Sequence, residues 1–145
     1  MRVGSEEIEF EVNSTEGAGG LVAAVVRMPA GGGPPALHRH EPSELYRVEQ
    51  GEFTFYVEDD GGVIRRRIAS PGETVAIAGR REHTIRNESD ADAVAFVVYA
   101  PGAGMEAFVR AAADLAAEEQ TSIERVLGVA AEHGIEITRP LAEVA

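Results

Sequence analysis

Apolar and polar residues alternate with a period of two in the first part of the chain. Within residues 7–12, Ile8, Phe10 and Val12 alternate with glutamates, which predicts one buried face of a half-buried strand. Residues 21–28 are apolar except for Arg27 and rich in β-branched side chains, which predicts a strand buried on both faces. Further strand-like runs lie between turn residues at 45–48, 52–58, 63–68, 74–77, 83–86 and 94–99. Short strands at this spacing predict an all-β sandwich or barrel.

The period changes to that of a helix after Pro101. Two groups of apolar residues recur at helical spacing: Met105, Phe108, Ala112 and Leu115, then Ile123, Val126, Leu127 and Ala130. Thr121 and Glu124 are placed as a capping box for the second helix, and Gly134 as its stop. We therefore predict a barrel at residues 1–100 and a helical extension at residues 101–145. The two helices pack on the barrel, cover its mouth or dimerise, and plain packing is the commonest of these outcomes.

Composition and charge exclude several classes of function. A chain of 145 residues suits one domain, and a formal charge of -12 opposes binding to a nucleic-acid backbone. The chain has no cysteine, so a metal site must use imidazole, carboxylate or water. There is no run of about 20 apolar residues to span a bilayer, and no apolar leader follows Met1. We expect a cytoplasmic protein that binds neither nucleic acid nor membrane.

Three of the four histidines lie in two short segments that also hold a glutamate. His38 and His40 are two residues apart, so within a strand they point the same way and can share one ion. Glu44 has the same parity, although Pro42 interrupts the ladder between them. His83 can supply a fourth ligand from another strand. Ordinary hydrogen-bonded polar residues are the alternative, but such a cluster buried without a cation costs on the order of several kcal/mol. We predict a site for one divalent metal ion.

The same residues give the chain a resemblance to the cupin family. Residues 32–51, GGPPALHRHEPSELYRVEQG, fit the first cupin motif, Gly-x5-His-x-His-x3-Glu-x6-Gly, at every specified position. The second motif, Gly-x5-Pro-x-Gly-x2-His-x3-Asn, is matched at Gly72, His83 and Asn87. Ala78 stands where the motif has proline, and Arg80 stands where it has glycine. An arginine at this position would narrow or charge the mouth of the barrel.

The resemblance covers roughly residues 5–100 and implies a small antiparallel jelly-roll barrel with a metal inside, bound by His38, His40, Glu44 and His83. The segment that begins at Pro101 is similar to the one that follows the barrel in some quercetinase-like cupins. Barrels of this family commonly pair through an exposed edge strand, so a homodimer is expected. His133 lies at the end of the second predicted helix, where interaction with the helix C-terminus explains it better than metal binding.

A site with three histidines and one carboxylate leaves coordination positions open and suits iron, manganese, nickel, cobalt, copper or zinc. Its local charge near plus one would attract a small anionic or chelating oxygen compound. Glu44 as a base and the Tyr46 hydroxyl are the predicted catalytic groups. We predict a metal-dependent dioxygenase, quercetinase-like, acting on a small aromatic or enolisable oxygen compound. A non-redox isomerase or cyclase, and a non-catalytic small-molecule-binding cupin, are the alternatives.

The interior of the barrel is predicted from strand parity. Tyr46 and Val48 share the inward face of Glu44, and three residues of the next strand form an apolar row, namely Phe53, Phe55 and Val57. Arg66 has two interpretations: it enters the barrel and binds a carboxylate, or it lies on a solvated edge strand. Asn87 is expected to hold a turn with its side chain.

Overall fold

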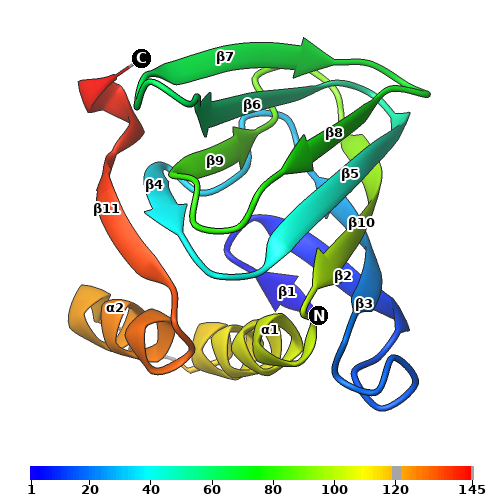
Figure 1. Cartoon of the computed structure of the whole chain (residues 1–145), viewed down its shortest axis with the longest axis vertical. Coiled ribbons are helices and arrows are strands. Elements are labelled where there is room, and N and C mark those ends of the chain that lie inside the picture. The colour runs from blue at the N-terminus through cyan, green and yellow to red at the C-terminus, as the bar shows by residue number, and fades with distance from the viewer. Residues whose placement is uncertain (119–121, 145) are drawn as a thin grey trace.

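The computed structural model describes residues 1–118 and 122–144, in which two antiparallel sheets pack face to face beside two α-helices (Figure 1). The strands are β1 (Arg2–Val3), β2 (Glu6–Val12), β3 (Val22–Met28), β4 (Ala36–Arg39), β5 (Ser43–Gln50), β6 (Phe53–Glu58), β7 (Ile64–Ala69), β8 (Thr74–Ile77), β9 (His83–Arg86), β10 (Ala93–Ala100) and β11 (Glu136–Pro140). The helices are α1 (Ala103–Ala116), α2 (Ile123–Glu132) and the short 3-10 helix η1 (Leu141–Glu143).

One sheet has the strand order β1-β2-β3-β10-β5-β8, and the other has the order β11-β4-β9-β6-β7. The alternation of β2 holds, since Ile8 is buried while Glu7 and Glu9 are exposed. Val48, Phe53 and Phe55 are buried where the two inner faces meet, as parity predicted. The all-β jelly-roll fold class with two C-terminal α-helices is therefore confirmed.

The two long helices lie side by side below the sheets (Figure 1). Helix α1 buries Met105, Val109 and Leu115. In α2 the side chain of Ser122 caps the first turn by accepting a hydrogen bond from the Arg125 N–H, 3.2 Å away, whereas the predicted capping residue Thr121 lies outside the described residues. Gly134 follows α2 with a φ of +75°, the left-handed conformation of a glycine stop.

The apolar face of α2 is only partly covered. Ala130 is buried, but Val126 and Leu127 are exposed and Ile123 is 75% exposed. Helical spacing thus predicted the element correctly and overstated how much of its apolar stripe the barrel covers. No helix of the described residues combines the length and apolarity that crossing a membrane requires.

The C-terminal segment also adds a strand that periodicity did not predict. Strand β11 joins the edge of the second sheet beside β4, with Ile137 opposite His38 and Glu136 opposite Arg39. Two nitrogens of the Arg139 guanidinium, Nη2 and Nε, donate hydrogen bonds to the buried Glu82 carboxylate at 2.9 and 3.1 Å. The end of the chain is therefore held against the strand that carries a predicted metal ligand.

Candidate metal centre

Strands β4, β5 and β9 bring the four predicted ligands to one place. His38 on β4 lies directly opposite His83 on β9, His40 follows β4, and Glu44 lies in β5. His40, Glu44 and His83 are buried, and His38 is partly buried. One ring nitrogen from each histidine lies within 4.8 Å of the others. Such a cluster fits a single metal ion.

Each histidine ring of the cluster is oriented by a backbone carbonyl group that lies near its Nδ1 atom. The Nδ1 atoms of His40 and His83 lie 2.9 Å from the Pro42 oxygen and 2.7 Å from the Arg81 oxygen, and Nδ1 of His38 lies 3.4 Å from the Ala36 oxygen. A carbonyl oxygen only accepts hydrogen bonds, so Nδ1 carries the proton and Nε2 presents a lone pair. This is the orientation that metal-binding imidazoles adopt in proteins. Pro42, which interrupts the ladder, thereby contributes its carbonyl to His40.

The remaining polar atoms of the cluster face one another without a hydrogen. The Glu44 carboxylate places Oε1 at 3.3 Å from His40 Nε2 and Oε2 at 3.1 Å from His83 Nε2. Both Nε2 atoms and Glu44 Oε2 are buried and have no hydrogen-bond partner among the described residues. Buried acceptors that point at one another are destabilising unless a cation lies between them. The residues present therefore fit a divalent metal ion.

The pKa values of the cluster follow from burial and from the mutual attraction of its members. Burial lowers the pKa of His38 to about 3, so this imidazole is neutral. Burial alone would raise the pKa of Glu44, but the attraction of the neighbouring His40 and His83 imidazoles outweighs it and holds the pKa below its usual range. Burial lowers the pKa of His83, but the Glu44 carboxylate outweighs burial and raises it. A proton and a metal ion therefore compete for His83.

Tyr46 lies in the interior beside the cluster, on the face that parity predicted. It is buried, and its ring packs at 5.3 Å from the Phe55 ring and 6.3 Å from the Phe53 ring, measured between centroids. Its hydroxyl hydrogen-bonds that of Tyr99. Burial and the charge of Glu44 raise the pKa values of both tyrosines, so both hydroxyls are protonated. Tyr99, opposite Glu44 on β10, was not among the predicted residues.

Glu6 is a second interior carboxylate that the sequence analysis missed. It is half-buried on β2 and shares the inward face of Ile8 and Phe10. Burial, followed by repulsion from Glu44, raises the pKa of Glu6 to about 7, against a smaller opposing effect of Arg86. The strand alternation carried this signal, because Glu6 has the parity of the apolar positions.

Other predicted residues lie away from the cluster. The Arg66 side chain is 52% exposed on the edge strand β7 and pairs with Glu88 at 3.1 Å, so the solvated interpretation holds and the interior clamp does not. Asn87 is fully buried and donates to the Met28 and Ala91 oxygens, as expected of a turn-holding residue. His133 lies at the end of α2, and its Nδ1 atom is 2.8 Å from the backbone oxygen of Val129.

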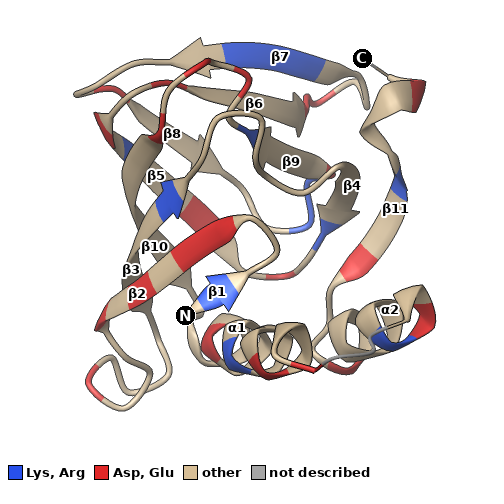
Figure 2. Cartoon of the chain, turned by 180° about the vertical axis from the view of Figure 1, so that it is seen from behind, with Lys and Arg blue, Asp and Glu red and all other residues tan. Residues whose placement is uncertain are grey.

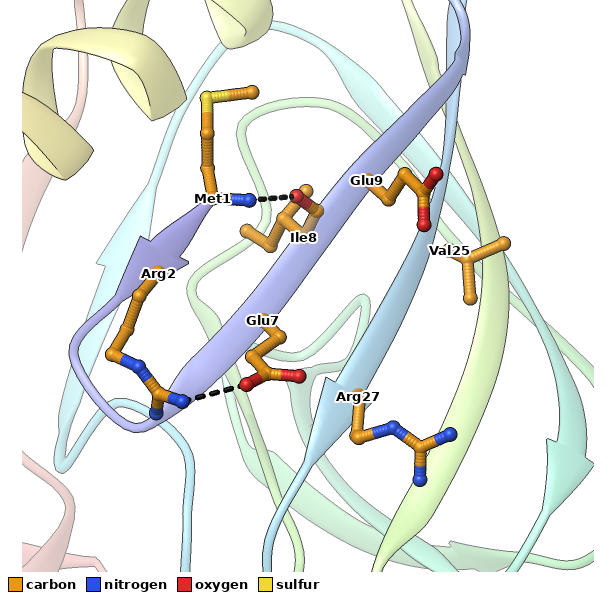
Figure 3. Close-up of a pocket in the computed structure, with 7 residues that line it drawn as sticks. All are labelled: Met1, Arg2, Glu7, Ile8, Glu9, Val25 and Arg27. Atoms are coloured by element: carbon orange, nitrogen blue, oxygen red, sulfur yellow. Dashed lines mark hydrogen bonds and ion pairs between the residues drawn. The ribbon is translucent and has the colours of Figure 1, made fainter.

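A surface hollow of about 570 Å³ lies over β1, β2 and β3, outside the sheet (Figure 3). The Met1 amino group donates to the Ile8 oxygen there, and Arg2 pairs with Glu7 at 2.6 Å. None of the predicted metal ligands lines this hollow. It is therefore separate from the candidate centre.

The two packed sheets and the buried histidine cluster define a jelly-roll protein with an interior centre for one ion. Residues 24–99 match the family described as Cupin domain, which is more than half of the chain. The chain belongs to this family. A comparison with curated proteins gives no match.

Solved structures share the fold at low identity. An oxalate decarboxylase from Lactobacillus farciminis, solved as its formate complex, has 21% identity and a TM-score of 0.59 over 69% of this chain and 30% of its own. An oxalate oxidase has 20% identity and a TM-score of 0.57 over 89% of this chain and 66% of its own. A polyketide cyclase from Streptomyces resistomycificus has 21% identity and a TM-score of 0.57 over 67% of this chain and 66% of its own. This chain spans less than a third of the decarboxylase, and these likenesses show the fold alone.

Proposed function

We propose that the protein binds one divalent metal ion through His38, His40, Glu44 and His83 and acts as a metal-dependent dioxygenase. The observation that carries the proposal is the convergence of buried lone pairs from two imidazoles on the Glu44 carboxylate. Three nitrogens and one oxygen leave coordination positions open for small ligands, as catalytic sites require. Iron, manganese, nickel, cobalt, copper and zinc all accept this donor set.

A redox-active ion, when bound, would mediate the transfer of electrons from a chelating substrate to dioxygen. The protein's own groups position the substrate and handle protons. The rings of Tyr46, Phe53 and Phe55 form an apolar wall that excludes water from the interior. The Glu44 carboxylate is ionised and would accept a substrate proton when it is not bound to the ion, while the protonated Tyr46 hydroxyl is the neighbouring donor.

The substrate we propose is a small aromatic or enolisable oxygen compound with an anionic oxygen. A divalent ion with one carboxylate ligand has a local charge near plus one, which favours enolate, phenolate and carboxylate oxygens. Two of the similar structures carry names of enzymes that act on the small dianion oxalate, which is compatible with this class. The cytoplasmic location expected from the sequence remains a prediction.

Oxygen consumption by metal-loaded protein tests the reaction. Protein purified without chelators is incubated with flavonols and with simple diketones in an oxygen electrode. We expect uptake that depends on substrate and is abolished in Glu44→Gln, while Glu11→Gln, an exposed carboxylate on the outer face of β2, leaves it unchanged. Bound metal without oxygen uptake for any of these substrates would contradict the dioxygenase.

A non-redox isomerase or cyclase is a second candidate, and the interior position of Glu6 favours it. Two carboxylates inside one barrel, with Glu6 near its midpoint of titration at neutral pH, suit proton transfer between two carbons. The test is hydrogen-deuterium exchange at the central carbon of a simple diketone without oxygen. Exchange by the zinc-loaded protein that is lost in Glu6→Gln would support this candidate. Metal binding with neither oxygen uptake nor exchange would leave a non-catalytic binding protein.

We also propose that the protein is a homodimer. An edge strand is the expected contact, and edge strand β8 adjoins an apolar row on the outer face of the six-stranded sheet. This row runs through Ala76, Leu45 and Val98 on the paired strands β8, β5 and β10. Leu45 is 41% exposed, although it lies in the middle of the row. Another edge strand, β7, carries consecutive arginines that oppose self-pairing (Figure 2).

Charge on the adjacent row supports a second copy as the occupant. This row crosses β2, β3, β10 and β5 through Glu9, Val25, Phe96 and Arg47, with opposite charges at its two ends. Figure 2 shows the acidic positions of β2 on this sheet. A twofold axis through Val25 and Phe96, the apolar residues in the middle of this row, would place Glu9 of each copy beside Arg47 of the other.

A further inference from the structure

A polar groove opens beside the candidate metal centre. It has a volume of about 360 Å³ and is lined by Arg39, His40, Glu41, Arg80, Gly134 and Glu136. His40 is one of the proposed metal ligands, so the groove and the centre share a wall. Its other walls come from the turn before β9 and from the segment that leads into β11.

Arg80 holds a backbone conformation that favours glycine. Its φ is +69°, and its N–H donates to the His40 oxygen at 2.7 Å, which fixes the turn against a metal ligand. Gly79 is confined as well, because an added Cβ would lie 2.1 Å from the Glu41 oxygen. The second cupin motif has glycine at the position of Arg80. This chain has an arginine there, although the backbone conformation is unfavourable for any residue other than glycine.

The contacts of the Arg80 side chain do not explain this conformation. Its guanidinium pairs with Glu41 at 3.2 Å, and the two side chains are 76% and 74% exposed. An exposed ion pair of this kind contributes little to stability. The guanidinium is therefore available to a ligand in the groove.

Arg39 contributes a second guanidinium group to the groove. Its Nε is buried and has no hydrogen-bond partner among the described residues. Its Nη2 lies 4.0 Å from Glu82 Oε1, an oxygen that Arg139 already occupies at 2.9 Å. A buried guanidinium donor left in this state indicates a missing acceptor.

We infer that this groove is a subsite for a carboxylate group of the substrate, bound by Arg39 and Arg80 while another oxygen group of the same molecule lies at the metal centre. Guanidinium groups recognise carboxylates through paired hydrogen bonds. Glu41 and Glu136 also line the groove, so the incoming carboxylate displaces Glu41 from Arg80. The inference rests on the proposed metal-dependent function and specifies its substrate class as dicarboxylates or hydroxy- and keto-acids with a carboxylate at the far end.

The test compares succinate with butyrate, which have the same chain length and differ by one carboxylate. Binding to zinc-loaded protein is measured by calorimetry. We expect succinate to bind about 10-fold more tightly than butyrate, a preference that charge-assisted hydrogen bonds of this kind supply. Arg80→Gly and Arg39→Gln should each remove the preference and leave butyrate affinity unchanged. Arg65→Gln, an exposed arginine paired with Asp59, is the matched control and should retain the preference.

Thermal unfolding of the metal-free proteins separates ligand binding from folding. Arg80→Gly should raise Tm by about 3 °C, because glycine adopts a positive φ without strain. A fall in Tm would show that Arg80 serves the fold and would overturn the inference. Equal affinities of wild type for succinate and butyrate, or a preference retained in both groove variants, would also overturn it. Failure to bind zinc would remove the proposed function and this inference together, whereas metal binding without the preference would remove the inference alone.

Discussion

Glu6 is the residue whose titration inside the barrel has the clearest effect on stability. An unfolded glutamate titrates near 4.5, whereas burial and repulsion from Glu44 raise the pKa of Glu6 to about 7. The folded state therefore holds this proton more tightly than the unfolded state. The protonated Glu6 side chain therefore stabilises the folded state fully below about pH 4.5, and this contribution is lost as pH rises through about 7. Arg86, Tyr46 and Tyr99 are the other ionisable groups that face it.

Replacement of this carboxylate should change stability in a pH-dependent way. We expect Glu6→Gln to raise the free energy of unfolding of the metal-free protein by about 2 kcal/mol at pH 8 and by much less at pH 5, since the wild-type side chain must ionise at the higher pH. Urea denaturation at the two pH values measures this. Glu11→Gln, on the outer face of the same strand, controls for the loss of one negative charge. An equal change at both pH values would contradict the assignment.

At the scale of residues, the sequence predicted which side chains meet but not how they are oriented. His38, His40 and Glu44 share strand parity, and the motif spacing added His83, so the cluster followed from the chain alone. The carbonyl groups that direct each ring, such as that of Pro42, depend on backbone bends that no periodicity encodes. Glu6 was missed because a glutamate among alternating glutamates was assigned to the surface, although its parity was that of Ile8.

Strand β11 shows how a single side-chain pair holds an element in place. Glu82 is buried immediately before β9 and receives two hydrogen bonds from Arg139 and one from Thr138, both in β11. The Arg139 guanidinium holds the pKa of Glu82 below its usual range. Loss of the guanidinium would leave a buried carboxylate without its main partner, which destabilises a protein far more than loss of a surface pair.

We expect Arg139→Met to lower the free energy of unfolding by about 2 kcal/mol, because Arg139 itself is partly exposed and the full penalty of a buried pair does not apply. Arg125→Met, which removes an exposed pair with Glu118 of similar length, should change it by less than about 1 kcal/mol. Chemical denaturation followed by circular dichroism gives both values. Equal effects would mean that β11 is not held through Glu82.

At the scale of elements, runs bounded by turn residues were predicted as strands, including the four-residue strands β8 and β9, whereas β1 and β11 were not predicted. β2 and β3 have the pattern and length that define a strand. β11 is five residues long and follows a helix, and its pairing with β4 is a contact between segments about a hundred residues apart. Local pattern contains no information on such a pairing. The apolar stripe of α2 likewise predicted a helix but not how much of it would be covered.

The whole molecule presents an apolar row that a second copy would cover. We expect light scattering to give a mass about twice the 15.4 kDa of one chain. Leu45→Glu should yield monomers, because it places one glutamate from each copy in the apolar part of the interface. The pairing of β5 with β8 and β10 within one copy is unaffected. Val63→Glu, at an exposed apolar position outside this face, is the control. A monomeric wild type, or a dimer unaffected by Leu45→Glu, would contradict the arrangement.

The metal content of the purified protein tests the central claim most directly. Elemental analysis after purification without chelators should find about one divalent ion per chain, because four ligands of this kind define one site. The ion should be lost in His83→Ala and retained in His133→Ala, whose ring lies at the end of α2. Wild-type protein that stays empty when supplied with iron, manganese, nickel, cobalt, copper or zinc, or equal losses in the two variants, would contradict the assignment.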